Sequence, residues 1–268
     1  MFSPKHLSCG IVCATLLLSA STLLTGCSNN NPVTPSAITV TGNWQFASTA
    51  ATAKGLPSLS GEFTGTSAAL TGIMHSDSAS SCIPPATAFD VTGTTNSAGV
   101  TTITGSGVAG GTLTITGNLA ANGKSFTTAS YNVVGGTCAF ATAVVATMAQ
   151  DFAPINGTYK GNFSDANGVV IAVSATLMQS STSDGSGNFT LTGTGSFPSN
   201  PCFNSPVTVS NTQVTGGNFT FTYADPTTTN SVVSNGTFST DGTMLTVTNW
   251  SLTGPCGPDS GTGLLTQQ

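Results

Sequence analysis

Apolar and polar residues alternate with a period of two through most of the chain. Leu113 and Ile115 are flanked by threonines, and Phe219, Phe221 and Tyr223 alternate with threonines in the same way. Each run places apolar side chains on one face of an extended chain, and the branched Cβ of threonine suits that backbone. No window of a dozen residues has helical spacing outside the N-terminal stretch. The pattern therefore predicts an all-β protein.

The spacing of these runs predicts about eight short strands in each half of the chain. In the first half we expect strands to start near Gly42, Leu59, Ala68, Ala86, Gly99, Gly111, Lys124 and Cys138. The second half has a similar number between Asn156 and Leu265. Eight short antiparallel strands joined by tight turns are typical of a small β-barrel or a β-sandwich.

The two halves match each other, which indicates a duplicated β-domain. Glycines, turn dipeptides and aromatic residues recur at an offset of 119 residues: Gly117 and Gly236, Asn122-Gly123 and Asp241-Gly242, Tyr131 and Trp250. The dipeptides predict type I′ hairpin turns, in which both central residues need a positive φ. We expect two domains, residues 37–150 and 151–268, divided where alternation pauses and Pro154 interrupts pairing.

The N-terminus has the parts of an export signal. Lys5 precedes an apolar stretch from Ile11 to Leu24, which is too short and too interrupted by Ser and Thr for a spanning helix. The stretch ends in Leu24-Thr25-Gly26-Cys27. This motif resembles the lipobox of bacterial lipoproteins, which implies a signal peptide over 1–26 and a lipid on Cys27.

Lipidation implies a membrane anchor, because two or three acyl chains bury many methylenes at about 0.8 kcal/mol each. The polar, proline-containing residues 27–36 predict a flexible tether. Ser28 follows the cysteine, and by the same resemblance it implies the outer membrane, with the folded part on its periplasmic or cell-surface face.

Charge excludes some partners. The expected mature chain has no arginine, and its three lysines (Lys54, Lys124 and Lys160) stand against nine acidic residues, a formal charge of −6. Nucleic-acid binding and polybasic membrane binding both need a cationic surface, so neither is expected. Disorder is the alternative for so polar a composition, but the regular alternation favours folded strands.

Four cysteines remain after the signal and the lipidated residue: Cys82, Cys138, Cys202 and Cys256. Disulfides persist in an exported chain, and four cysteines allow three pairings. Duplication favours the pairs Cys82–Cys138 and Cys202–Cys256. Each disulfide would close a loop and stabilise its domain by about 4 kcal/mol in the chain-entropy model. A metal site is the alternative, but it requires Cys or His residues close together in pairs. The chain after the signal has no CxxC motif and one histidine, so we expect no metal or other cofactor.

Two further resemblances concern the mature chain. The opening Gly42-Asn43-Trp44 resembles the first strand of lipocalin-like and avidin-like barrels, which implies a barrel that carries a small ligand. Residues 131–138 (YNVVGGTC) and 250–256 (WSLTGPC) are similar to Thr/Gly-rich bacterial lipoproteins with duplicated, cysteine-bridged β-domains. That family implies no known activity.

Catalytic groups are scarce. His75 is the sole histidine after the signal, and its Ser-rich surroundings predict a solvated loop. Most acidic residues stand beside Gly, Asn, Ser or Pro, where aspartate serves turns. Asp165 opens a faintly calcium-like loop whose later ligands are missing. The aromatic residues Trp44, Tyr131, Tyr159 and Trp250 recur at equivalent positions, which favours core packing over a sugar-binding platform.

We therefore expect no catalytic residues and a non-enzymatic envelope lipoprotein that binds or scaffolds an envelope protein, a glycan or another partner. A lipocalin-like carrier of a small apolar ligand is the alternative, and a filled or open barrel interior distinguishes the two. A carboxylate-dependent glycoside hydrolase has less support, since it rests only on the nine available acids.

Overall fold

The computed structural model describes residues 37–48, 56–78, 83–84, 87–137, 142–198, 200–204 and 206–268. These residues form seventeen β-strands and no α-helix, so the all-β prediction is confirmed. No helix among them is long and apolar enough to cross a membrane. The expected signal peptide, Cys27 and tether lie outside the described residues, as do Cys82 and Cys138. Residues 37–268 belong to one compact unit.

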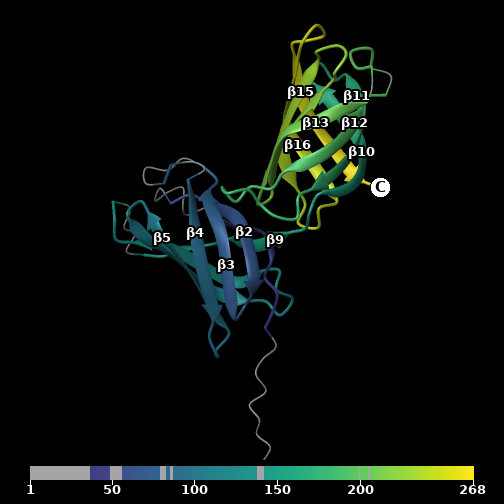
Figure 1. Ribbon diagram of the computed structural model, residues 1–268. Coiled ribbons are helices and arrows are strands. Elements are labelled where there is room, and N and C mark those ends of the chain that lie inside the picture. The colour runs from purple at the N-terminus through teal and green to yellow at the C-terminus, as the bar shows by residue number, and fades with distance from the viewer. Residues whose placement is uncertain are drawn as a thin grey trace, which may run out of the picture. The chain divides into compact units, whose positions relative to one another are not determined.

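The first nine strands form one antiparallel sheet that curls into a half-barrel (Figure 1). Its spatial order is β8-β7-β6-β5-β4-β3-β2-β1-β9. The strands are β1 (Gly42–Ala47), β2 (Leu59–Thr66), β3 (Ala69–Ser76), β4 (Ala88–Thr95), β5 (Val100–Val108), β6 (Gly111–Leu119), β7 (Phe126–Val134), β8 (Val144–Val145) and β9 (Met148–Phe152).

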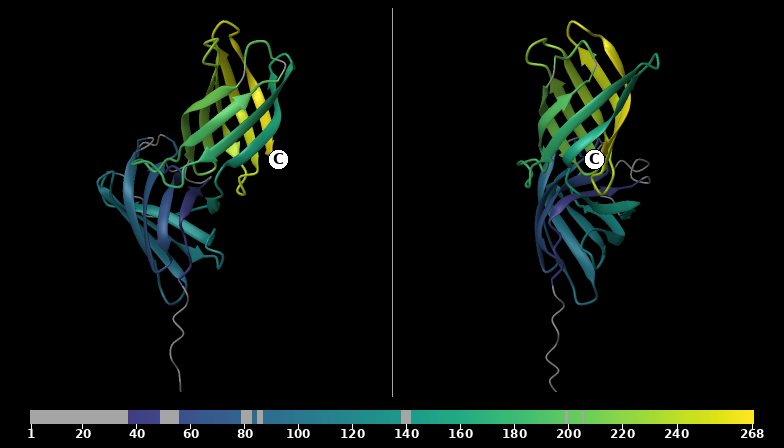
Figure 2. Two further views of the ribbon diagram at one scale, coloured as in Figure 1. Left: turned by 45° about the vertical axis from the view of Figure 1, so that its right-hand side comes forward. Right: turned by 90° about the vertical axis from the view of Figure 1, so that its right-hand side faces the viewer.

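The last eight strands form a closed antiparallel barrel, in which each strand slants across the barrel (Figure 2). They are β10 (Asn156–Asp165), β11 (Val170–Gln179), β12 (Leu191–Ser196), β13 (Val207–Thr215), β14 (Asn218–Ala224), β15 (Ser231–Phe238), β16 (Met244–Thr253) and β17 (Asp259–Gln267). The barrel closes because β17 pairs with β16 on one side and with β10 on the other.

The half-barrel stays open because its closing segment is divided. β8 pairs only with Ser130 and Tyr131 of β7, whereas β9 pairs with β1. The two short strands occupy the position in chain order that the continuous β17 has in the barrel. The last strand also runs to Phe152, so β9 crosses the expected domain division between residues 150 and 151.

Each body has its own apolar core, built from the inward positions of the alternating strands. The core of the half-barrel centres on Trp44, which contacts Phe63 and Phe126 with ring centroids 5.5 and 5.4 Å apart. Strand β9 is the exception to this division, because partly buried Met148 packs against the barrel core and so does Phe152. The backbone of Phe152 pairs with Asn43 in the half-barrel sheet, but its ring packs in the barrel core, 5.3 Å from Phe238.

The hairpin turns differ from the prediction. Among the turn residues, Gly123 and Gly242 have positive φ (70° and 73°), but Asn122 and Asp241 do not, so the type I′ assignment is wrong. Each loop is longer than two residues and closes by a bond from the glycine amide to the carbonyl three residues earlier. Longer hairpin loops of this kind need a positive φ only at the glycine.

Candidate functional site

The barrel interior is filled by aromatic side chains. Trp250 stacks on Phe163 at 5.7 Å, and Phe197 stacks on Phe203 at 4.4 Å. The four repeated aromatics Trp44, Tyr131, Tyr159 and Trp250 are all at most 1% exposed, so their predicted role as core residues is confirmed. The buried phenols of Tyr131 and Tyr159 donate hydrogen bonds to backbone carbonyls at 3.0 and 2.6 Å.

His75 is not in a solvated loop, contrary to the sequence-based expectation. It lies in β3 with 2% of its surface exposed. Its Nδ1 lies 2.9 Å from the carbonyl oxygen of Ser186, and its Nε2 lies 2.7 Å from Oγ1 of Thr215. A carbonyl only accepts, so Nδ1 carries the proton and Nε2 accepts from the threonine hydroxyl. Burial lowers the pKa of His75, and this outweighs the opposite effect of nearby Asp77.

His75 belongs to a polar seam between the outer face of β1–β3 and two loops of the barrel. Asn43 forms two bonds with the backbone of Gly216, both 2.8 Å. The carboxylate of Glu62 accepts from the amide and the hydroxyl of Ser183, at 2.9 and 2.6 Å. We define the polar seam as Asn43, Gln45, Glu62 and His75 on the half-barrel, with Ser183, Ser186, Thr215, Gly216 and Gly217 on the barrel.

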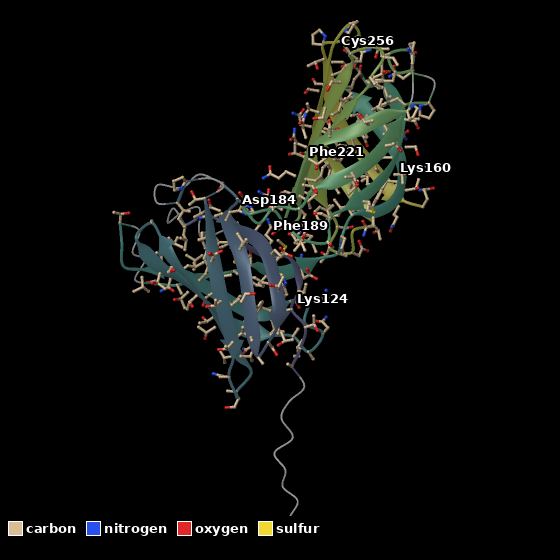
Figure 3. All side chains as sticks on the ribbon, viewed as in Figure 1. Lys124, Lys160, Asp184, Phe189, Phe221 and Cys256 are labelled. Carbon is tan, nitrogen blue, oxygen red and sulfur yellow. A yellow bond between two sulfur atoms is a disulfide. The ribbon has the colours of Figure 1, made fainter. Side chains whose placement is uncertain are left out.

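Local chemistry shapes the two loops that enter the seam. Asp184 Oδ1 accepts the amides of Ser186 and Asn188, which folds the β11–β12 loop back on itself. That loop lies at the end of the barrel opposite Cys256 (Figure 3). In the β13–β14 turn, Gly216 has φ 52°, and a Cβ there would lie 2.6 Å from Ser60 Oγ and 2.8 Å from Gln45 Cβ. Only glycine fits the close approach.

The seam explains why the buried polar groups are there. Their donors and acceptors are directed at each other across the two bodies, and buried polar groups need such partners. The Thr215–His75 contact has the elements of a hydroxyl and a base, but Nδ1 meets a backbone carbonyl rather than a carboxylate. The arrangement holds the two bodies together.

Turn chemistry accounts for four of the aspartates. Oxygens of Asp165, Asp184, Asp225 and Asp241 accept backbone amides within their own turns. Hydrogen bonds from Ser239 and Thr243 lower the pKa of Asp241 to about 2. Among the described residues, no three His, Cys, Asp or Glu side chains gather as a metal site, and the carboxylate of Asp165 bonds its own loop.

Asp151 is the acidic residue with an ionic partner. Its Oδ2 lies 2.6 Å from Nζ of Lys124, the one ion pair among the described residues. Asp151 is buried, whereas Lys124 is largely exposed. Burial raises the pKa of Asp151, and the bond from Lys124 opposes that effect.

The predicted Cys202–Cys256 disulfide is present, with Cα atoms 5.8 Å apart. It joins the β12–β13 and β16–β17 loops. The buried side chain of Asn230 links the same two loops, because its Nδ2 donates to the carbonyl of Cys202 and its Oδ1 accepts from the amide of Cys256 at 3.1 Å. The partner pair, Cys82 and Cys138, falls outside the described residues.

The outer face of the half-barrel carries aligned rows of threonine, which we call the threonine rows. Strand registers place one residue from each of six strands opposite the next: Thr64, Thr71, Thr92, Thr104, Thr114 and Asn132. A second row, two residues along the strands, contains Thr94, Thr102, Thr116 and Ser130. Sequence alternation predicted outward threonines, but it could not give their register.

Two shallow hollows lie on this face. One, of about 400 Å³, is lined by Thr71, Thr92, Thr94, Thr102 and Thr104 around Gly93. The other, of about 520 Å³, is lined by Thr116, Asn118, Thr128 and Ser130 around Gly117. The described lining of both hollows contains no charged residue. Side chains that can both donate and accept hydrogen bonds therefore line both hollows.

Comparison of the chain with protein-family models, with curated proteins and with solved structures gave no match.

Proposed function

We propose that the protein is a lipid-anchored bacterial envelope lipoprotein that acts as a non-enzymatic binding module. The observation that carries this proposal is the contrast between the interior and the outer surface. The barrel interior is filled by the chain's own aromatic and aliphatic side chains, whereas the threonine rows and their two hollows face outward. A binding function would therefore use the outer surface.

The carrier alternative has less support. A barrel that carries an apolar ligand needs an interior cavity of several hundred Å³. In the described part of the chain, Trp250, Phe163, Phe197 and Phe203 occupy that volume in contact with one another. A hydrolase has less support again, because the aspartates at turns are engaged by their own backbones and His75 is buried.

The lipobox-like Leu24-Thr25-Gly26-Cys27 supports the anchor and the outer-membrane location, with Ser28 in the position after the lipidated cysteine. The similarity to Thr/Gly-rich bacterial lipoproteins supports the same compartment. An oxidising compartment also fits the Cys202–Cys256 disulfide.

Replacement of Cys27 by serine tests the anchor. We expect the wild type to incorporate labelled palmitate and to sediment with membranes, because several acyl chains give stable insertion. The Cys27→Ser protein should take up no label and should be recovered in the soluble fraction. A matched Cys13→Ser variant, altered within the signal, should behave as the wild type. An unlabelled wild type, or a Cys27→Ser protein that still sediments with membranes, would refute the anchor.

A further inference from the structure

We propose that the threonine rows bind an extended chain of a neutral, hydroxyl-rich polysaccharide that runs across the strands from β3 to β7. This inference deepens the binding function proposed above and rests on it. It names a surface and a partner class, and both follow from the register, the hydrogen-bonding state, the charge and the curvature of this face.

The register makes the face periodic. Neighbouring strands are about 4.8 Å apart, and residues two apart along a strand are roughly 7 Å apart. Thr92, Thr104 and Thr114 thus repeat at the strand spacing, with Thr94, Thr102 and Thr116 in a parallel row beside them. A partner that can engage several members of a row must itself repeat. A polymer of similar units meets that requirement.

Four hydroxyls in the middle of the rows are available to a ligand, whereas the hydroxyls of Thr64 and Thr71, and those of Thr116 and Ser130, bond each other. Thr92, Thr94, Thr102 and Thr104 are exposed, and none of the four hydroxyls is hydrogen-bonded to another described residue. A threonine hydroxyl donates one hydrogen bond and accepts others, which is also the capacity of a sugar hydroxyl. The threonine methyl groups and Gly93 supply the small apolar surface on which the carbon side of a sugar ring can rest.

Charge selects a neutral polymer. No member of either row is charged, and Asp90, exposed on the same face of β4, carries a negative charge, so an anionic chain would find no cation in the rows. The whole chain has a formal charge of −5, which repels polyanions. A hydroxyl-rich polymer without charge avoids this repulsion and can still form hydrogen bonds with the threonine hydroxyls.

Curvature selects a flexible chain over a flat partner. The sheet curls into a half-barrel, and its outer face is the convex one (Figure 2). A rigid flat partner, such as the surface of a crystalline solid or the flat face of a second sheet, could contact only a few strands at once. A polysaccharide chain can bend along the rows through both hollows. It therefore reaches more hydroxyls than a flat partner.

Affinity electrophoresis of the full-length protein in neutral detergent tests the proposal. The gels contain one of four neutral polymers (hydroxyethyl cellulose, laminarin, dextran or galactomannan) or the anionic polymer alginate. We expect at least one neutral polymer to retard the wild type and alginate to leave it unretarded. Absence of retardation by all four neutral polymers, or retardation by alginate alone, would overturn the proposal.

Valine substitutions assign the binding to the rows. Valine has the shape of threonine and suits a strand, so Thr92→Val, Thr102→Val and Thr104→Val together remove three hydroxyls while the sheet is kept. We expect affinity to fall at least about tenfold, which corresponds to about 1.4 kcal/mol for three hydrogen bonds. The matched control is Thr192→Val, Thr194→Val and Thr208→Val, on exposed positions of β12 and β13 in the barrel.

The outcomes separate this inference from the anchor. Unchanged affinity in the row variant, or equal losses in the row and control variants, would show that the rows are not the binding surface. Palmitate labelling is independent of both variants. A labelled, membrane-bound protein that binds no neutral polymer would leave the lipoprotein assignment intact and remove only the polysaccharide.

Discussion

At the residue scale, the structure differs from the sequence-based expectation most clearly at His75. A Ser-rich neighbourhood indicated a solvated loop, but the residue is in β3 and alternates with inward-facing Met74. Its outward position alone would expose it. The ring is buried because Ser186 and Thr215, more than 100 residues away, cover it. Local pattern carries no information about such a distant contact, so this part of the seam could not be predicted.

Substitution of His75 by glutamine should weaken the pH dependence of stability. Because the folded pKa lies below the ordinary 6.5, His75 favours the folded state fully above pH 6.5 and loses this contribution as pH falls below it. Each unit of lowering corresponds to about 1.4 kcal/mol. Glutamine keeps a donor and an acceptor but does not titrate, so urea midpoints at pH 7.5 and 5.0 should lie closer together in His75→Gln than in the wild type.

Substitution of Asp77, which lies near the His75 ring, is the control for that measurement. Burial raises the pKa of Asp77, so its contribution is lost as pH rises above 3.8, the opposite direction to His75. Asp77→Asn also removes a charge that raises the pKa of His75, so the His75-dependent loss between pH 7.5 and 5.0 should remain or grow in this variant. If His75→Gln and the wild type lose equal stability over this range, the ring does not stay neutral in the folded seam.

At the element scale, the strands were predictable and their pairing was not. Alternation placed the first seven strand starts within two residues of those observed, including Gly42 for β1 and Gly111 for β6. It failed at the eighth, expected near Cys138, because the closing segment is split into β8 and β9. Alternation indicates which face of the sheet a side chain occupies, whereas the threonine rows depend on the register between strands. Irregularities such as the one between Ser106 and Val108 also change that register.

A substitution in the β13–β14 turn measures how closely the two bodies approach. Gly216→Ala must keep a positive φ and place a methyl against Gln45 and Ser60. Gly168→Ala, in the β10–β11 turn, must also keep a positive φ, 84°, but its Cβ would have nothing within 4 Å. We expect Gly216→Ala to lower the free energy of unfolding by at least about 1 kcal/mol more than Gly168→Ala, as overpacking adds to strain. Equal losses in urea titrations would mean that the turn does not pack on β1 and β2.

At the scale of the whole molecule, two apolar cores are joined by a polar contact. The core of the half-barrel and the core of the barrel share no residue, and β9 is where a strand of the first body contributes to the core of the second, through buried Phe152 and partly buried Met148. The seam between them is made of amides, hydroxyls, a carboxylate and an imidazole, all of which water can solvate. Apart from Met148 and Phe152, separation of the two bodies would expose little apolar surface, and this argues that each half can fold independently.

Residues 37–150 and 151–268, expressed separately in an oxidising compartment, should each unfold cooperatively on heating and give dispersed amide spectra. The barrel half keeps all eight strands, the Cys202–Cys256 disulfide and the ring of Phe152. The half-barrel piece loses two pairing residues of β9 and the Asp151 partner of Lys124. Residues 37–150 should therefore melt at a lower temperature than a piece extended to residue 154. Both halves should be less stable than the same bodies in the full chain, since neither keeps the seam. A half that stays disordered while the full chain folds would mean that the two bodies depend on a shared core, because solvation of the seam residues alone cannot unfold a strand sheet whose interior is intact.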